Sequence, residues 1–402
     1  MITPTRPRRT ALRAARLFDG IRTAADPLVL VEDGMITAVE FGPRAPVPPD
    51  AELIDLPGAT LLPGLIDTHV HLAFDGGLEP VAALAGRDRD GVLGAMADAA
   101  AAQLLAGVTT VRDLGDRDFL ALDFRESAAG PLPTIVAAGP PITSVDGHCH
   151  FLGGTVSGVD GVRAAVREHA ARGVDVIKVM ASGGMMTPGT DVHAPQFSPA
   201  ELRALVDEAH RHGLPVTAHA HALDAITSAV EAGVDGLEHC SFLTADGIVV
   251  PDRLVEAIVA RRIVVGATLG FVPTDLDVKP PPGLLEMLPR LMAVLARLCR
   301  DGAVVVAGTD AGIAPVKPHG VLPSGLVQLA QLAGGPESAL RAGTHLAAQV
   351  CGLGDRKGRV APGFDADLLA VDGDPLADIS ALCRPLAVLA GGEVVVRPAL
   401  TP

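Results

Sequence analysis

Residues 63–71, PGLIDTHVH, join an apolar run to two histidines at its end. The run begins at Leu61, and we predict a buried strand over Leu61–His69. Side chains two positions apart in an extended chain point the same way, so His69 and His71 can face one metal ion. Two histidines at this spacing also occur by chance, so the pair alone does not decide the chemistry.

Seven further apolar runs, rich in β-branched residues, follow along the chain. Their near-continuous hydrophobicity is typical of parallel strands covered on both faces. They are Val108–Arg112, Thr134–Ala138, Val174–Met180, Pro215–His219, Gly236–His239, Ile263–Thr268 and Ala303–Asp310. Eight strands alternating with helical stretches predict an α/β fold, a (β/α)8 TIM-like barrel. An open doubly wound sheet is the alternative, but it does not explain where the histidines fall.

The clearest helix start is at Ser198. Ser198 and Glu201 form a capping-box pattern, and Pro199 falls at the first helical position. Leu202, Leu205, Val206 and Ala209 then recur at helical spacing. We therefore predict an amphipathic helix after Ser198.

The two ends of the chain have a different pattern from the middle. Asp-Gly and Gly-Gly pairs between short apolar runs are hairpin signals, and they occur near residues 33–34, 372–373 and 391–392. We predict that residues 1–59 and 357–402 pair into one small β-sandwich beside a barrel of residues 60–356. The stretch Pro280–Pro282 is predicted to be a loop.

Four more polar residues fall at the ends of predicted strands. Lys178, His219, His239 and Asp310 end the fourth, fifth, sixth and eighth strands. Barrel active sites assemble at the C-terminal ends of the strands, so these residues and the first two histidines indicate a metal site. A lysine in a buried strand is costly unless it is paired or modified, which leaves a structural ion pair or a carboxylated lysine. Other histidines are predicted on solvated helix surfaces, namely His169, His210, His212 and His345.

The composition limits the possible partners. Among 402 residues the net charge is −15, which disfavours nucleic acid and anionic membranes. The sequence has no charge-free apolar run of transmembrane length and no secretory leader pattern. Five widely spaced cysteines suit reduced thiols, so we expect a cytoplasmic protein. A small-molecule substrate is the expected partner. We also expect a homo-oligomer.

These motifs together resemble the amidohydrolase superfamily over residues 12–395. The resemblance is strongest to an imidazolonepropionase-related branch that includes Xaa-Pro and Xaa-Arg dipeptidases and ochratoxin, phenylurea and molinate hydrolases. The matching stretches are Pro63–His71, Ile177–Val179 with Ser182–Gly184, His219, Leu237–His239, Gly308–Gly312 and Pro362–Leu369.

The resemblance implies a centre of two divalent metal ions, with Zn²⁺ preferred and Mn²⁺ or Fe²⁺ as alternatives. It implies that His69, His71 and Asp310 hold one ion and that His219 and His239 hold the other. Lys178, carboxylated by CO₂, and a hydroxide would bridge the pair. Such a centre would hydrolyse a C–N bond in an amide, dipeptide, carbamate or urea, with Asp310 carrying the proton to the leaving nitrogen.

Three further histidines are predicted at the substrate. His148 matches a histidine that the branch often places near the substrate carbonyl, so it is a candidate catalytic and substrate-binding residue. His221 takes the position at which some dipeptidases have a tyrosine that contacts substrate, and this chain has no tyrosine. His319, in a loop after the last strand, is also predicted to line the pocket. Loop histidines of this kind can equally be solvated.

Three other functions stay open at this point. A mononuclear deaminase or cyclic-imide hydrolase would keep the histidines and the aspartate, but such relatives generally lack the lysine at Lys178. Lactone or phosphotriester hydrolysis would use the same centre. A non-catalytic scaffold is disfavoured because this chain retains all six predicted ligands.

Overall fold

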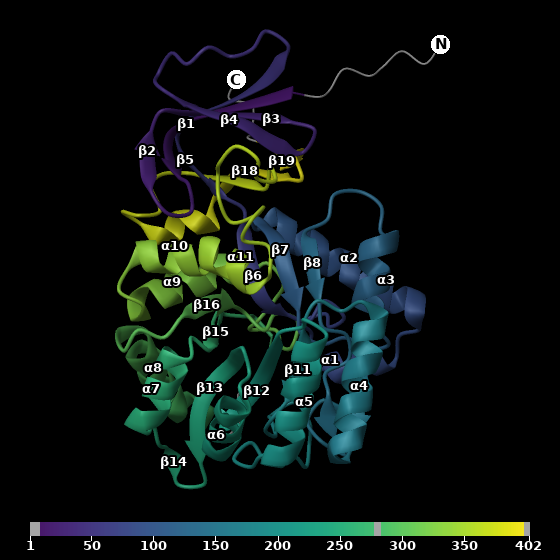
Figure 1. Ribbon diagram of the computed structural model, residues 1–402. Helices are drawn as coiled ribbons and strands as arrows, with labels where there is room; N and C mark the ends of the chain where they lie inside the picture. The colour runs from purple at the N-terminus through teal and green to yellow at the C-terminus, as the bar shows by residue number, and fades with distance from the viewer. Residues whose placement is uncertain (1–8, 277–282, 398–402) are drawn as a thin grey trace.

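The computed structural model describes residues 9–276 and 283–397, and its largest part is a barrel of eight parallel strands (Figure 1). Hydrogen bonds join three of the strands in one sheet and five in another. The bridges Val70–Ala311 and Ile142–Val179 join the two sheets at both seams. The barrel strands are β6 (Leu65–Val70), β7 (Val108–Asp113), β8 (Thr134–Ala137), β11 (Ile177–Met180), β12 (Val216–Ala222), β13 (Gly236–Thr244), β15 (Val264–Thr268) and β16 (Val305–Gly308). The predicted fold is confirmed.

Helices connect the barrel strands and cover the outside of the barrel (Figure 1). They are α1 (Pro80–Ala85), α2 (Arg89–Leu105), α3 (Leu120–Ser127), α4 (Gly158–Arg172), α5 (Pro199–Arg211), α6 (Leu223–Ala232), α7 (Asp252–Ala260), α8 (Leu284–Arg300), α9 (Leu322–Leu332), α10 (Pro336–Ala342) and α11 (His345–Val350). Short elements lie in the loops: β9 (Thr143–Ser144), β10 (Thr155–Val156), β14 (Gly247–Ile248) and the 3₁₀ turns η1 (His150–Leu152) and η2 (Ile379–Cys383).

Helix α5 begins as its sequence predicts. The Glu201 amide donates to Ser198 Oγ at 3.3 Å, and the Ser198 amide donates to Glu201 Oε2 at 2.8 Å. This reciprocal pair satisfies backbone donors that the first helical turn leaves open. The apolar positions at helical spacing, Leu202 and Leu205 among them, are buried against the barrel.

Strands from both ends of the chain form a second sheet beside the barrel, called here the terminal sheet (Figure 1). Its strands are β1 (Arg9–Phe18), β2 (Thr23–Ala25), β3 (Pro27–Glu32), β4 (Met35–Phe41), β5 (Ala51–Pro63), β17 (Leu368–Val371), β18 (Pro385–Ala390) and β19 (Glu393–Val396). The predicted pairing of the two ends is confirmed, because β5 pairs with β1 on one side and β17 on the other. Apolar residues of both ends, such as Leu12, Leu61 and Leu389, share one core.

The predicted strand Leu61–His69 is wrong at its start. Leu61–Pro63 end β5 in the terminal sheet, and the barrel strand begins only at Leu65. Gly64 lies at the change of sheet, where a Cβ would stand 2.1 Å from Thr109 Oγ1. Hydrophobicity runs unbroken across this point, so a pattern of buried residues cannot reveal that the chain passes from one sheet to another. The predicted loop at residues 280–282 lies outside the described residues.

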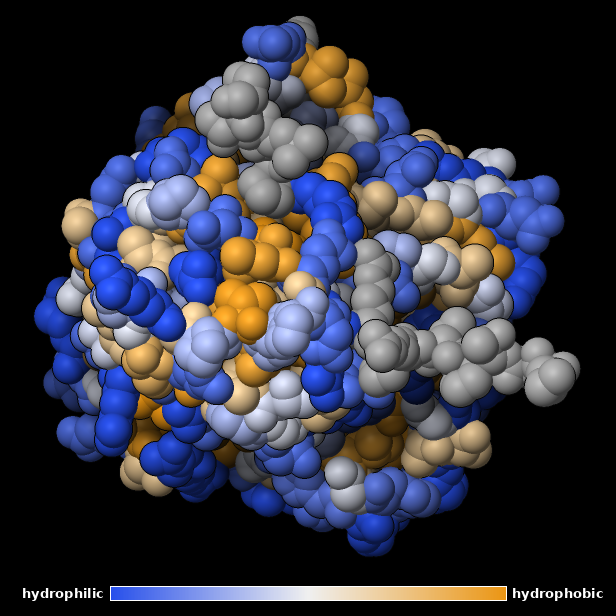
Figure 2. Space-filling model, turned by 90° about the horizontal axis from the view of Figure 1, so that it is seen from above, coloured by the Kyte–Doolittle hydropathy of each residue, from blue (hydrophilic) through white to orange (hydrophobic). Residues whose placement is uncertain are grey.

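The surface at the terminal-sheet end is mostly hydrophilic, with apolar patches between the polar residues (Figure 2). Apolar side chains of the terminal sheet that reach the surface include Phe41 and Leu53. Within residues 9–276 and 283–397, no helix combines the length and hydropathy needed to span a membrane. The oligomeric state and the domain boundaries stay predictions.

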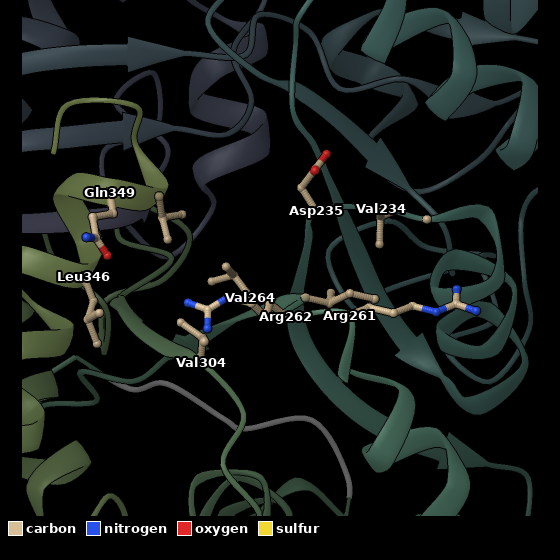
Figure 3. A pocket seen from close by; sticks show the side chains of 11 residues that line it. Val234, Asp235, Arg261, Arg262, Val264, Val304, Leu346 and Gln349 are labelled. Carbon is tan, nitrogen blue, oxygen red and sulfur yellow. The ribbon is translucent and has the colours of Figure 1, made fainter. Parts of the chain in front are cut away.

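A hollow of about 390 Å³ lies at the N-terminal ends of β13, β15 and β16. Leu346 and Gln349 of α11 face Val234, Asp235 and the arginines across it (Figure 3). Its complete lining is Gly233, Val234, Asp235, Arg261, Arg262, Ile263, Val264, Val304, Leu346, Gln349 and Val350. This end of the barrel therefore presents arginines and apolar side chains and contributes no histidine to the hollow.

Candidate metal centre

Histidines from β6, β12 and β13 meet at the opposite, C-terminal end of the barrel. The ring centroids of His69 and His71 are 5.3 Å apart, those of His69 and His239 5.4 Å, and those of His219 and His239 4.8 Å. Within residues 9–276 and 283–397, two groups have ligand atoms within 4.8 Å of one another: His69, His239 and Asp310, and His219, His221 and His239. Four of the predicted ligands therefore belong to compact groups suited to a metal ion.

Hydrogen bonds hold one nitrogen of each of these rings. His69 Nδ1 lies 2.9 Å from Glu238 Oε2, and His71 Nδ1 lies 2.9 Å from the Gly115 carbonyl oxygen. His239 Nδ1 lies 2.9 Å from Thr268 Oγ1. Partners of this kind fix the ring orientation and leave Nε2 for a metal ion.

In His219 the other ring nitrogen, Nε2, has the hydrogen-bond partner. Its Nε2 lies 3.1 Å from the Gly183 carbonyl oxygen, so Nδ1 is the nitrogen left for coordination. Burial lowers the pKa of His219 and His239 well below the usual value, and neighbouring imidazoles lower it further. Both rings are therefore neutral near pH 7, the form in which imidazole binds metals.

Asp310 stands directly after β16 and faces the first two histidines. Its Oδ1 lies 3.2 Å from His71 Nε2 and 3.4 Å from His69 Nε2. Its amide donates to the His69 carbonyl oxygen at 2.7 Å, which holds a left-handed backbone with φ of 60°. Burial would raise the pKa of Asp310, but His69 and His71 bring it below its usual range. The side chain is thus an anion in contact with both imidazoles.

Lys178 lies in the middle of this group on β11 and is 1% exposed. Its Nζ is 3.4 Å from His69 Nε2, and among the described residues no carboxylate lies within 4 Å of it. Burial lowers the pKa of Lys178, although Glu238 and Asp310 oppose the shift. The predicted alternative of a direct structural ion pair therefore finds no support in this geometry.

The three predicted substrate residues lie in different surroundings. His148 is 4% exposed, with its ring 4.7 Å from that of His219 and its Nδ1 without a hydrogen-bond partner. The ring of His221 lies 4.6 Å from that of His239. His319 stands apart, with Nε2 2.9 Å from the Phe74 carbonyl oxygen, and borders a separate hollow with Asp75 and Arg87. Contact of these residues with substrate stays a prediction.

A buried ion pair beneath the histidines was not foreseen. Glu238 Oε2 accepts from His69, while its Oε1 accepts from Arg112 at 2.9 Å and from Thr217 Oγ1 at 2.7 Å. The pKa of Glu238 is lowered because Arg112 and His69 outweigh the effect of its burial. The available signal was a charged side chain within each of two otherwise apolar strands, Arg112 in β7 and Glu238 in β13.

A further histidine lies in surroundings that differ from its prediction. His169 is not solvated as predicted: it is 2% exposed, and its ring nitrogens lie 2.8 and 2.7 Å from the carbonyl oxygens of Ala165 and Pro140. It faces inward because α4 turns that side toward the loop after β8.

All five cysteines are free thiols, and burial raises the pKa of Cys149 to about 12 and that of Cys240 further. Neither is a ready nucleophile.

Eight strands, outer helices and histidines at the strand ends define the class of metal-binding barrel proteins. The chain matches the Amidohydrolase family over residues 60–395, and it belongs to that family. The predicted resemblance is confirmed.

Individual relatives agree with this assignment. An ochratoxinase from Aspergillus niger is 32% identical over 251 residues, which cover 61% of this chain and 51% of that protein, so the match spans about half of the relative's length. An imidazolonepropionase from Cereibacter sphaeroides is 28% identical over 398 residues, covering 92% of this chain and 94% of that protein. The crystal structure of a Xaa-Pro dipeptidase with bound methionine in the active site superposes with a TM-score of 0.83 at 26% identity, covering 96% of this chain and 99% of that one.

Proposed function

We propose that this chain is a metal-dependent hydrolase that cleaves a C–N bond in a small amide, dipeptide, carbamate or urea. The observation that carries the proposal is the convergence of histidine, aspartate and lysine side chains at the C-terminal end of one barrel. Relatives named as a Xaa-Pro dipeptidase and as an ochratoxinase support it.

The residues present fit a pair of divalent metal ions. His69, His71 and Asp310 would hold one ion, and His219 and His239 would hold the other. Lys178, carboxylated by CO₂, would help to hold both ions. Burial lowers the pKa of its amine, which favours the uncharged form that reacts with CO₂. Imidazole and carboxylate ligands suit Zn²⁺. Bound ions would supply an activated water near neutral pH and a Lewis acid for the substrate carbonyl.

Proton transfer falls to Asp310. Its carboxylate is ionised and held against His69 and His71, so it can accept the proton of the attacking water. The same carboxyl group can then deliver that proton to the leaving nitrogen. No cysteine is required, in keeping with the raised pKa of Cys149.

His148 is the proposed substrate-side residue. Its buried Nδ1 lacks a partner in the structure, which is costly unless another molecule supplies one. Burial, with a smaller effect of His221, lowers the pKa of His148 to about 3, so the ring is neutral near pH 7. It can therefore donate one hydrogen bond to a substrate carbonyl oxygen without carrying a charge.

The test is a hydrolysis screen of the full chain with added Zn²⁺ and bicarbonate. The substrates are N-acyl amino acids, Xaa-Pro and Xaa-Arg dipeptides, ochratoxin-like amides and phenylureas. Lys178→Ala should lose metal and activity together, and a short carboxylate such as propionate should restore part of both. A Lys178→Ala protein with full metal content and full turnover would remove the carboxylated lysine from the proposal. One bound ion in the wild type would favour the mononuclear alternative.

A further inference from the structure

His221 lies in the histidine cluster but is not in the predicted ligand set. It follows His219 by two positions on β12, the same spacing that brings His69 and His71 together on β6. Its ring centroid is 4.7 Å from that of His219 and 4.6 Å from that of His239. A ligand atom from each of these three rings lies within 4.8 Å of the other two.

Both the ring and the backbone of His221 are held in place. Its Nδ1 lies 2.9 Å from Ser241 Oγ, and its amide donates to Ser182 Oγ at 2.9 Å. The partner at Nδ1 leaves Nε2 for coordination, as Thr268 does for His239. The two rings also lie nearly parallel, at an interplanar angle of 21°.

We propose that His221 is a third imidazole ligand of the ion held by His219 and His239. The inference rests on the proposed function, because it requires that the cluster binds metal, and it replaces the predicted substrate contact of His221. Three imidazoles with an open position form a set that suits a catalytic Zn²⁺. Some dipeptidases have a tyrosine that contacts substrate at this position. This chain has no tyrosine, and its histidine there binds the metal ion in place of substrate.

The proposal makes the two ion sites electrically unequal. The site of His69 and His71 includes the carboxylate of Asp310, whereas the site of His219, His221 and His239 has neutral side chains apart from the shared Lys178. Because Asp310 adds a negative charge to the first site, that site should attract a divalent cation more strongly, and the three-imidazole site should be the weaker one. Loss of His221 should therefore affect the second ion to bind.

Titration of the metal-free full chain with Co²⁺, followed by visible absorbance, tests this. The wild type should bind two ions, and His221→Phe should bind the first normally and the second at least about 10-fold more weakly. His148→Phe is the matched control, because its ring also lies 4.7 Å from His219 but outside both ligand groups. It should bind both ions as the wild type does.

A second measurement needs no variant. In the Co²⁺-loaded wild type, each coordinated imidazole contributes one strongly shifted ring N–H resonance in proton NMR. Five such resonances are expected, from His69, His71, His219, His221 and His239; four would overturn the inference even if His221→Phe fails to fold. Two ions bound with unchanged affinity in a folded His221→Phe would also overturn it and leave the proposed function standing. A wild type that binds no Co²⁺ would contradict both the inference on His221 and the proposed function.

Discussion

The two ends of the barrel are built from the same strands but differ in chemistry. Strand β13 has Asp235 just before its N-terminal end, where the carboxylate accepts from the Val216 amide at 2.8 Å and lies 2.9 Å from His210 Nε2. At the point where its pairing with β15 ends, the same strand carries Glu238 and His239, whose partners turn imidazoles toward a common centre. Polar groups at the first end satisfy backbone and surface groups, whereas those at the second are held with nitrogens left for a further partner. The difference supports our proposal that the C-terminal end is the reactive one.

The largest effect should come from Asp310→Asn. The amide cannot accept a proton as the carboxylate does, so turnover should fall by about 10²–10⁴-fold on the substrate that the screen identifies. Arg262→Ala, at the hollow of the other end, should leave turnover within about twofold because surface substitutions rarely change a distant site. Equal losses of turnover in both variants would contradict the functional difference that we infer between the two ends.

Glu238→Gln tests the buried ion pair beneath the histidines. It leaves Arg112 without its carboxylate and weakens the hold on His69, so we expect about 3 kcal/mol less free energy of unfolding. Metal affinity should fall about 10–100-fold. Denaturant unfolding and metal titration measure the two effects.

The matched control for that variant is Glu208→Gln. Glu208 pairs with Arg167 and Arg211 on the outer helices, away from the histidine cluster. It should lower stability less and leave metal affinity unchanged. Loss of metal in both glutamine variants would point to general unfolding instead of a specific hold on His69.

Thr268→Val should have a smaller and purely local effect. It removes the oxygen that accepts from His239 Nδ1 and keeps the shape of the side chain. Metal affinity should weaken about 10-fold. Thr227→Val, which removes a hydroxyl bonded to the Leu223 carbonyl oxygen in α6, should not change it. Competition with a coloured chelator would show whether the two variants differ.

The smallest effect is expected from Ser198→Ala at the start of α5. Loss of the cap should cost about 1 kcal/mol of stability with no change in bound metal. Hydrogen bonds from the Ser198 amide and hydroxyl lower the pKa of Glu201, so its contribution is present above its unfolded-state pKa and is lost as the pH falls through its folded-state pKa. The stability difference between wild type and variant should therefore shrink in acid, as thermal melts over pH 3–7 would show.

The sequence predicted the barrel because each strand is an apolar run with its own helix, and these signals are local. It placed the candidate ligands at strand ends, since the position of a histidine after a strand is also local, and the structure brings four of them into compact groups. The break at Gly64 was missed because burial continues through it while the pairing partner changes.

Contacts between segments that are distant in the sequence could not be predicted, because no local pattern encodes them. Arg112 and Glu238 are 126 positions apart, and the residues next to each of them in the sequence do not indicate that they pair. His169 was misplaced because only the packed loop after β8 supplies the carbonyl oxygen of Pro140. The compact group of His219, His221 and His239 likewise depends on how β12 and β13 leave the barrel.

Native mass spectrometry of the wild-type chain, purified with Zn²⁺ and bicarbonate, tests the central claim most directly. We predict a mass that exceeds the polypeptide by two zinc ions and one CO₂, and a carbamate ¹³C resonance in the folded protein, loaded from ¹³C-bicarbonate, that Lys178→Ala lacks. A fully folded chain that carries neither added metal nor added CO₂ under these conditions would contradict it.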